Sequence, residues 1–344
     1  MKPPLNPAAD QARYEALEAV RQQGTLADKV RRRAERAALV ARGRAAGARV
    51  LDPSEGEVTR AANRLEQFSR DIELARVSRD VYRLPGQSGG PPLGWTRLSD
   101  DLNQLPPELQ SPGLWRDEKS GYVAGLYKEA DELGGRTVLA FRGTADKPGW
   151  LTDVTQSAGQ TTDQYERAGR LAKLTKKYLG PDLLTTGHSL GGGLATKASA
   201  LTGARGATFN PAGLHPESLR GSGRTPEDAA ALLTDYHVPA EALSSVQSAA
   251  GRAALAPLVT VVRGGMAAAG RMGRPTAPGD FVPATIPGPT GQHVQLPPVR
   301  AAEVPLLSGA TRHKAISPIQ GMEQQKELDR ATIERYAGRA DGAD

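Results

Sequence analysis

The stretch of residues 183–201 decides the fold, and it reads LLTTGHSLGGGLATKASAL. Its apolar start is typical of a short buried strand, and its Ala- and Gly-rich end is typical of a helix that packs closely on its neighbours. Gly187 and Gly191 mark a tight turn between the two. The stretch therefore predicts a strand, a turn and a helix in direct succession.

The turn itself contains a G-x-S-x-G pattern, formed by Gly187, Ser189 and Gly191. Between a strand and a helix, this pattern is typical of a nucleophile elbow, a strained turn that lifts a serine hydroxyl above the sheet. A glycine-rich turn would also suit a phosphate-binding loop. Neither G-x-x-x-x-G-K-[ST] nor G-x-G-x-x-G is completed here, so the pattern favours Ser189 as a nucleophile.

The flanking sequence continues the alternation of strands and helices. Short apolar runs predict strands at 122–127, 137–141, 183–186, 207–210 and 234–238, and helical patterns cover 164–178, 190–201 and 226–233. Such alternation implies an α/β fold with a doubly wound, mostly parallel sheet. A Gly-, Pro- and Ala-rich stretch at about 245–300 breaks this rhythm and is expected to be an insertion.

The N-terminal part differs in character. We expect residues 1–70 to form a helical, basic extension and residues 71–344 to form the α/β unit. The segment Leu26–Val50 carries eight basic residues against Asp28 and Glu35. This basic stripe would suit peripheral contact with an anionic membrane, and a solvated helical face explains it as well. No aromatic residue is interleaved to stack on bases, so nucleic acid is not an expected partner.

Several classes are excluded or disfavoured by composition. The chain has no cysteine, which excludes thiol catalysis, disulfides and metal–thiolate sites. No run of about 18 apolar residues is present, so no membrane span is expected. The start lacks the apolar core of a conventional signal peptide. The expected location is therefore the cytoplasm of the producing cell, or outside it after export by a dedicated machine.

A family resemblance rests on three motifs. These are FRGT at 141–144, a Trp-Leu-x-Asp run at 150–153, and GHSLGGGLA at 187–195, and together they resemble the class 3 lipases of the α/β-hydrolase fold. Tyr165, the stretch TFNPAGLH at 208–215 and the surroundings of His313 further resemble lipase-like bacterial effectors. The resemblance implies a serine esterase that cleaves lipid or phospholipid esters through an acyl-enzyme and needs no metal or organic cofactor. A neutralising partner protein would suit such an effector.

The resemblance also implies site residues. In class 3 lipases, backbone N–H groups after the RG pair and after the nucleophile form the oxyanion hole, and here those belong to Thr144 and Leu190. The acid stands in the loop after the strand that follows TFN, where this chain has Glu241. Asp280 and Asp235 are the alternatives. Asp153 is expected to hold the oxyanion loop rather than to act in catalysis.

A histidine must take the proton of the serine, and in this fold the chain order is Ser, acid, His. No Asp or Glu lies between Ser189 and His215, and His237 falls inside a predicted strand. His313 and His293 remain. We favour His313, because it lies between a short apolar run at 304–307 and a final helix. Two other classes stay open: an inert hydrolase-fold interaction protein, and an anionic-membrane or nucleic-acid binder.

Overall fold

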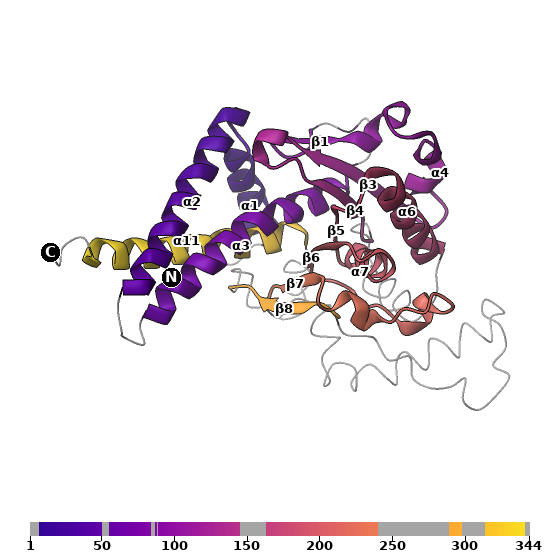
Figure 1. Ribbon diagram of the computed structural model, residues 1–344. Coiled ribbons are helices and arrows are strands. Elements are labelled where there is room, and N and C mark those ends of the chain that lie inside the picture. Colours follow the sequence, from indigo (N-terminus) through magenta and orange to yellow (C-terminus); the bar gives the residue numbers. More distant parts are fainter. Residues whose placement is uncertain are drawn as a thin grey trace.

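The computed structural model describes residues 7–49, 55–83, 87, 89–144, 163–239, 289–297 and 314–340. Within these ranges the chain forms one eight-stranded mixed sheet, in the order β1-β3-β4-β5-β6-β7-β8, with β2 paired to β3 (Figure 1). The strands are β1 (Trp95–Arg97), β2 (Arg116–Asp117), β3 (Tyr122–Glu129), β4 (Thr137–Phe141), β5 (Leu183–His188), β6 (Arg205–Phe209), β7 (Leu233–His237) and β8 (Gln292–Gln295).

β3 is the strand that runs against the others in the sheet. β1, β2 and β4 are antiparallel to β3, whereas β4 to β8 are all parallel. Parallel strands place their carboxyl ends at one edge, where functional loops gather in open α/β sheets. The predicted α/β-hydrolase class, with its mostly parallel sheet, is therefore confirmed.

Helices cover both faces of the sheet, as the doubly wound pattern predicts (Figure 1). On one face lie α6 (Asp163–Leu179) and α7 (Leu190–Thr202), whose apolar side chains share a core with β3 and β4. On the other face lie α3 (Glu55–Asp80) and α11 (Ile316–Ala340), which share a second core with β6 and β7. The elbow between β5 and α7 thus lies between two well-packed layers.

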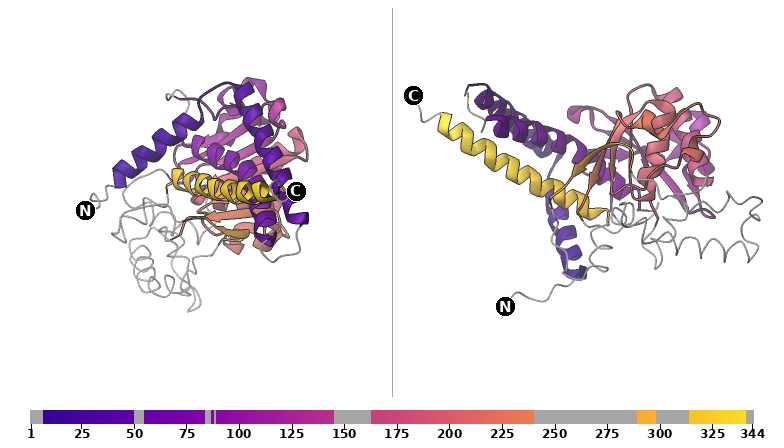
Figure 2. Two further views of the ribbon diagram at one scale, coloured as in Figure 1. Left: turned by 90° about the vertical axis from the view of Figure 1, so that its left-hand side faces the viewer. Right: turned by 90° about the horizontal axis from the view of Figure 1, so that it is seen from below.

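The first two helices, α1 (Pro7–Arg21) and α2 (Leu26–Arg49), lie on the α3 and α11 side. Figure 2 shows α2, α3 and α11 side by side, projecting together from the sheet. A small apolar core that includes Leu39, Val40 and Ile333 holds them. α3 passes residue 70, the expected domain boundary, without a break. The start of the chain therefore packs directly on its last helix.

Most predicted elements are confirmed to within a few residues, and the exceptions have simple causes. The helix expected at 226–233 is only the 3-10 turn η6 (Pro226–Ala229), because β7 already begins at Leu233. β8 lies within the stretch expected to be an insertion, because Gln292–Gln295 extend the sheet beside β7. The apolar run at 304–307 lies outside the described residues.

The remaining elements are short, and none was predicted. They are η1 (Leu98–Asp100), η2 (Leu102–Gln104), η3 (Pro107–Leu109), α4 (Pro112–Trp115), η4 (Asp131–Leu133) and η5 (Pro216–Leu219). None of the helices in the described parts of the chain combines the length and the apolar character that crossing a membrane would need.

Candidate active site

Ser189 has the backbone conformation of a nucleophile elbow. Its φ of 59° and ψ of −129° are unusual for a residue with a side chain. Among the described residues, only Ser189 and Asn210 have a positive φ without being glycine. Such a conformation costs of the order of 1–3 kcal/mol and persists only where the surroundings hold it. The G-x-S-x-G turn is therefore strained, as the sequence predicts.

Backbone hydrogen bonds hold Ser189 in place. Its N–H donates to the carbonyl of Phe209 at 3.1 Å, and its own carbonyl accepts from Gly192 at 2.8 Å and from Ala212 at 2.9 Å. The elbow is thus fixed from α7 on one side and from the end of β6 and its following loop on the other.

The two glycines of the motif are required by close backbone contacts. A Cβ on Gly187 would overlap the carbonyl oxygen of Gly191, and a Cβ on Gly191 would overlap the carbonyl oxygen of Phe141. The second contact brings the end of β4 against the first turn of α7. The FRGT motif, which begins at Phe141, therefore lies directly beside the turn that contains Ser189.

Gly143 of that motif lies against the elbow. A Cβ on Gly143 would stand 3.2 Å from the Cβ of Ser189 and 2.5 Å from the carbonyl oxygen of His188. Thr144 follows in the chain and is half-buried. Leu190 is the first residue of α7, where backbone N–H groups have no partner inside the helix and the helix dipole favours negative charge. Both expected oxyanion donors thus belong to segments that flank Ser189.

Sequence reasoning did not find Tyr82, which lies just beyond α3. Its hydroxyl is 3.0 Å from Nδ1 of the buried His188. Thr186, two residues earlier on β5, bonds to the carbonyl of Leu74 in α3. Because side chains alternate along a strand, His188 lies on the α3 side of the sheet as well. No motif marks Tyr82, since its role depends on where α3 ends relative to β5.

Asn210, the last residue of the TFN motif, joins the ends of two strands. Its Oδ1 accepts a hydrogen bond from the N–H of Val238 at 2.9 Å, and its own N–H donates to the carbonyl of Tyr236 at 2.8 Å. Its φ is 43°. The structure gives a physical reason for the asparagine of this motif. Asn210 holds the backbone where the chain leaves β7 and continues toward Glu241.

Asp235, an alternative acid, is already engaged in holding the sheet together. Its buried carboxylate accepts hydrogen bonds from Thr208 Oγ1 at 2.5 Å and from the N–H of Gly291 at 2.6 Å. Burial raises the pKa of this carboxyl, while these two hydrogen bonds and His293 act in the opposite direction. The contacts join β6, β7 and the residue just before β8.

The same carboxylate lies beside two histidines. Ligand atoms of Asp235, His237 and His293 are all within 4.8 Å of one another, and the two imidazole rings stack with centroids 4.8 Å apart. Nitrogen and oxygen ligands of this kind suit a divalent transition metal. Each carboxylate oxygen of Asp235 accepts a hydrogen bond, one from β6 and one from the residue before β8, so this carboxylate has a structural role in the sheet.

His293 lies far from β5, the strand that leads to Ser189, and His215 is engaged in a local cap. His293 pairs in register with Asp235, and β8 is the third strand from β5. At about 4.8 Å per strand, its backbone is roughly 14 Å from β5. His215 accepts a hydrogen bond at Nδ1 from the N–H of Glu217 and caps η5. Glu241, Asp280, His313 and the Trp-Leu-x-Asp run at 150–153 lie outside the described residues.

Two comparisons with known proteins agree with this geometry. The model of a phospholipase-like family, the Tle-like phospholipase domain, matches residues 73–286. An extracellular phospholipase A1 of Serratia liquefaciens is 40% identical over 156 residues, which are 45% of this chain and 46% of that protein. The match therefore spans about half the length of the curated relative.

Proposed function

Because this chain belongs to the Tle-like phospholipase family, we propose that it is a serine hydrolase that cleaves carboxylic esters of phospholipids. The observation that carries the proposal is the strained conformation of Ser189 between β5 and α7. A packed fold keeps such strain at a serine where the placement of its hydroxyl serves a reaction.

The reaction follows from the elbow. Ser189 Oγ attacks the ester carbonyl while a histidine takes its proton, and the carbonyl oxygen becomes negatively charged. The N–H groups of Thr144 and Leu190 stabilise that oxygen. The histidine then protonates the departing alcohol, which leaves an acyl-enzyme, and a water molecule activated by the same histidine releases the fatty acid.

We assign the base to His313. Each of the four histidines that the structure describes has a place elsewhere: His188 faces Tyr82, His215 caps η5, and His237 and His293 lie on β7 and β8. His313 precedes Ile316, the first residue of α11, by three residues, which is at most about 11 Å of chain.

The acid is assigned to Glu241 by a similar argument. Ile316 and Val238 belong to one buried cluster that also contains Phe209, whose carbonyl holds Ser189. Glu241 follows Val238 by three residues and His313 precedes Ile316 by three, so the shared cluster supports this assignment. Asp235 is the weaker alternative because its carboxylate holds β6 and β8. We keep Asp280 as the second alternative.

Several side chains of the basic stripe at 26–50 form ion pairs with acidic residues of the same chain. Lys29 pairs with Glu73 at 2.5 Å, Arg33 with Glu129 at 3.4 Å, and Arg44 with Glu66 at 2.6 Å. We therefore propose residues 1–70 as a helical layer that packs on the hydrolase unit. Contact with an anionic membrane rests on the remaining cations, and a role in binding nucleic acid is disfavoured.

The name of the Serratia relative makes the sn-1 ester the first candidate bond and an extracellular site of action the first candidate place. Lipase-like effectors act on the membranes of other cells, so export and a neutralising partner protein belong to the same proposal. An inert interaction protein is the competing function, and intact activity would dismiss it.

A lipid screen tests the proposal. Purified wild type and Ser189→Ala are incubated with vesicles of phosphatidylethanolamine, phosphatidylglycerol or phosphatidylcholine, each with different acyl chains at sn-1 and sn-2, and with a triglyceride emulsion. We expect fatty acid and lysolipid from wild type on phospholipid and none from the variant. Equal product from both proteins would remove Ser189 as nucleophile, and no product from either on any ester would favour the inert reading.

A further inference from the structure

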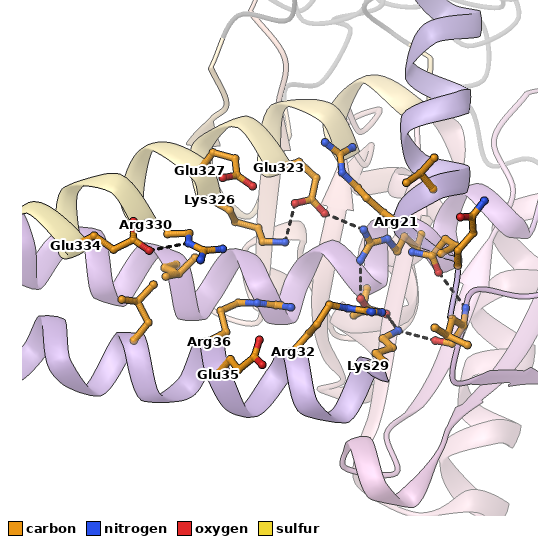
Figure 3. A pocket seen from close by; sticks show the side chains of 18 of the residues that line it. Arg21, Lys29, Arg32, Glu35, Arg36, Glu323, Lys326, Glu327, Arg330 and Glu334 are labelled. Atoms are coloured by element: carbon orange, nitrogen blue, oxygen red, sulfur yellow. Dashed lines mark hydrogen bonds and ion pairs between the residues drawn. The ribbon is translucent and has the colours of Figure 1, made fainter. Parts of the chain in front are cut away.

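A cavity of about 600 Å³ lies where α1, α2, α3 and α11 meet (Figure 3). Its walls join residues 20–42 near the start of the chain to residues 323–334 near its end. Eight cationic and five acidic side chains line it, so positive charge is in excess. Among the residues that the structure describes, none assigned to catalysis lines the cavity.

The acidic groups of the inner wall already have partners. The buried Arg76 bonds to Glu73 at 2.7 Å, to Glu323 at 2.8 Å, and to Glu18 at 2.6 Å. Lys29 and Lys326 add second cations to Glu73 and Glu323, at 2.5 Å and 2.8 Å. Both carboxylates are thus shared between two cations each, and they have little left to offer a third.

Three guanidinium groups of the lining, those of Arg32, Arg36 and the exposed Arg42, form no ion pair within the described parts of the chain. Arg32 and Arg36 lie one helical turn apart on α2, and Figure 3 shows their side chains in the space between α2 and α11. Within the described parts of the chain, neither has a carboxylate within 4.0 Å. Burial lowers the pKa of Arg36, and Arg76 and Arg33 add to that effect, against attraction from Glu323 and Glu73. Like charges at this spacing destabilise a helix.

We propose that this cavity binds a phosphate-bearing ligand, held by the guanidinium groups of Arg32 and Arg36 with Lys326 opposite them on α11. A dianionic phosphate monoester would neutralise both of these arginines at once. Guanidinium groups present planar pairs of donors that match phosphate oxygens.

The size of the cavity fits the same class of ligand. About 600 Å³ lies within the range of small-molecule sites, roughly 300–1,000 Å³, and leaves room beyond a phosphate for an organic part. The apolar side chains of Leu39 and Val20 also line the cavity. The bound ligand would bridge α2 to α11 and so hold the first and last helices together.

The first test is thermal unfolding and titration calorimetry with inorganic phosphate and glycerol phosphate, against sodium chloride of equal ionic strength. We expect both phosphates to raise the Tm of wild type with the logarithm of their concentration. Arg32→Gln/Arg36→Gln should abolish the shift, and without phosphate its Tm should equal or exceed that of wild type. The control Arg60→Gln/Arg170→Gln removes two exposed arginines outside the cavity and should shift like wild type.

A second measurement needs no variant in the cavity. Phosphate should slow amide hydrogen exchange in α2 and α11 of wild type and of Ser189→Ala alike, while α6 and α7 stay unchanged. Ser189→Ala lacks the proposed nucleophile but keeps the cavity. Slower exchange in this variant would therefore support phosphate binding even if the proposed hydrolase function were wrong.

A third arm separates two sources of the phosphate group. Vesicles of phosphatidylcholine with phosphatidic acid are compared with phosphatidylcholine alone. A rise in Tm with the soluble phosphates indicates a free ligand. A rise in Tm with phosphatidic acid alone indicates a lipid headgroup. The proposal would be overturned if neither the soluble phosphates nor phosphatidic acid shifted the Tm beyond the effect of sodium chloride or of phosphatidylcholine alone. It would also be overturned if the Arg32→Gln/Arg36→Gln variant shifted as much as wild type.

Discussion

Gly143 lies in direct contact with Ser189: a Cβ built on Gly143 would stand 3.2 Å from the Cβ of the serine. The same Cβ would crowd the Tyr82 hydroxyl and the carbonyl oxygen of His188. The loop that follows β4 is therefore positioned by the absence of a side chain, and Thr144 is the next residue along it.

We expect Gly143→Ala to displace this loop and move the N–H of Thr144 out of the proposed oxyanion hole. Loss of one such donor typically lowers kcat by about 100- to 1000-fold, and KM should change much less. Steady-state kinetics on a soluble short-chain ester measures both. Gly113→Ala is the matched control, because a Cβ on Gly113 has nothing within 4 Å. Unchanged kcat in Gly143→Ala would contradict the placement of the loop.

Ser189→Gly should be inactive and yet at least as stable as wild type. Glycine adopts the φ of 59° without the steric cost that serine bears, which is of the order of 1–3 kcal/mol. Greater freedom of glycine in the unfolded chain offsets about 0.5–1 kcal/mol of this gain. Urea unfolding measures the difference against Ser189→Ala, which keeps the strain. A glycine variant less stable than the alanine variant would argue against a strained elbow.

His313→Ala should lose activity as completely as Ser189→Ala, since the members of a triad act as one unit. His293→Ala should keep activity, because β8 is three strands away from β5. Fluorophosphonate labelling of Ser189 gives a second readout that does not depend on the lipid. The reverse result, with an inactive His293→Ala and an active His313→Ala, would identify His293 as the base and favour Asp280 as the acid.

Glu241→Gln should retain more activity than His313→Ala, because loss of the acid alone is the milder lesion in such triads. Asp235→Asn should act mainly on stability, since its carboxylate accepts hydrogen bonds from Thr208 and Gly291. Comparing kcat with the urea midpoint for both variants distinguishes the two roles. A folded Asp235→Asn with kcat as low as that of His313→Ala would make Asp235 the acid.

Glu73→Gln should destabilise the protein by about 3–5 kcal/mol at pH 7, because it leaves the buried Arg76 and Lys29 short of a counter-charge. Glu66→Gln, which breaks an exposed pair with Arg44, should cost less than about 1 kcal/mol. Urea unfolding of the three proteins measures both values. Equal losses would mean that the buried network contributes no more than a surface pair.

The stabilisation by Glu73 should also depend on pH. Burial alone would raise the pKa of Glu73, but Arg76 and Lys29 outweigh it and hold the pKa well below the usual 4.5. A carboxyl with a lowered pKa in the folded state stabilises fully above its unfolded pKa. The gap between wild type and Glu73→Gln should therefore be constant from pH 7 to about 5.5 and shrink as the pH falls below about 4.5.

The sequence alone determined the strained turn between a strand and a helix and the alternation of strands and helices, and it predicted Ser189 as the nucleophile. These features depend on neighbours in the chain: Gly187 and Gly191 flank Ser189, and the apolar runs have the lengths and spacing of strands and helices. The FRGT motif could likewise be connected to Ser189, through a family resemblance. Local patterns of this kind survive in the sequence because the physical requirement and the residues that meet it are a few positions apart.

Only the tertiary structure decided which distant residues meet. Tyr82 reaches His188, Asn210 holds Val238, and Arg76 collects carboxylates from α1, α3 and α11. The basic stripe is compatible with a free surface in the sequence, yet Lys29 and Arg33 pair with the buried Glu73 and Glu129, and Arg44 pairs with Glu66 at the surface. A charge count cannot reveal such pairs, because their partners lie tens of residues away and packing alone brings them within hydrogen-bonding distance.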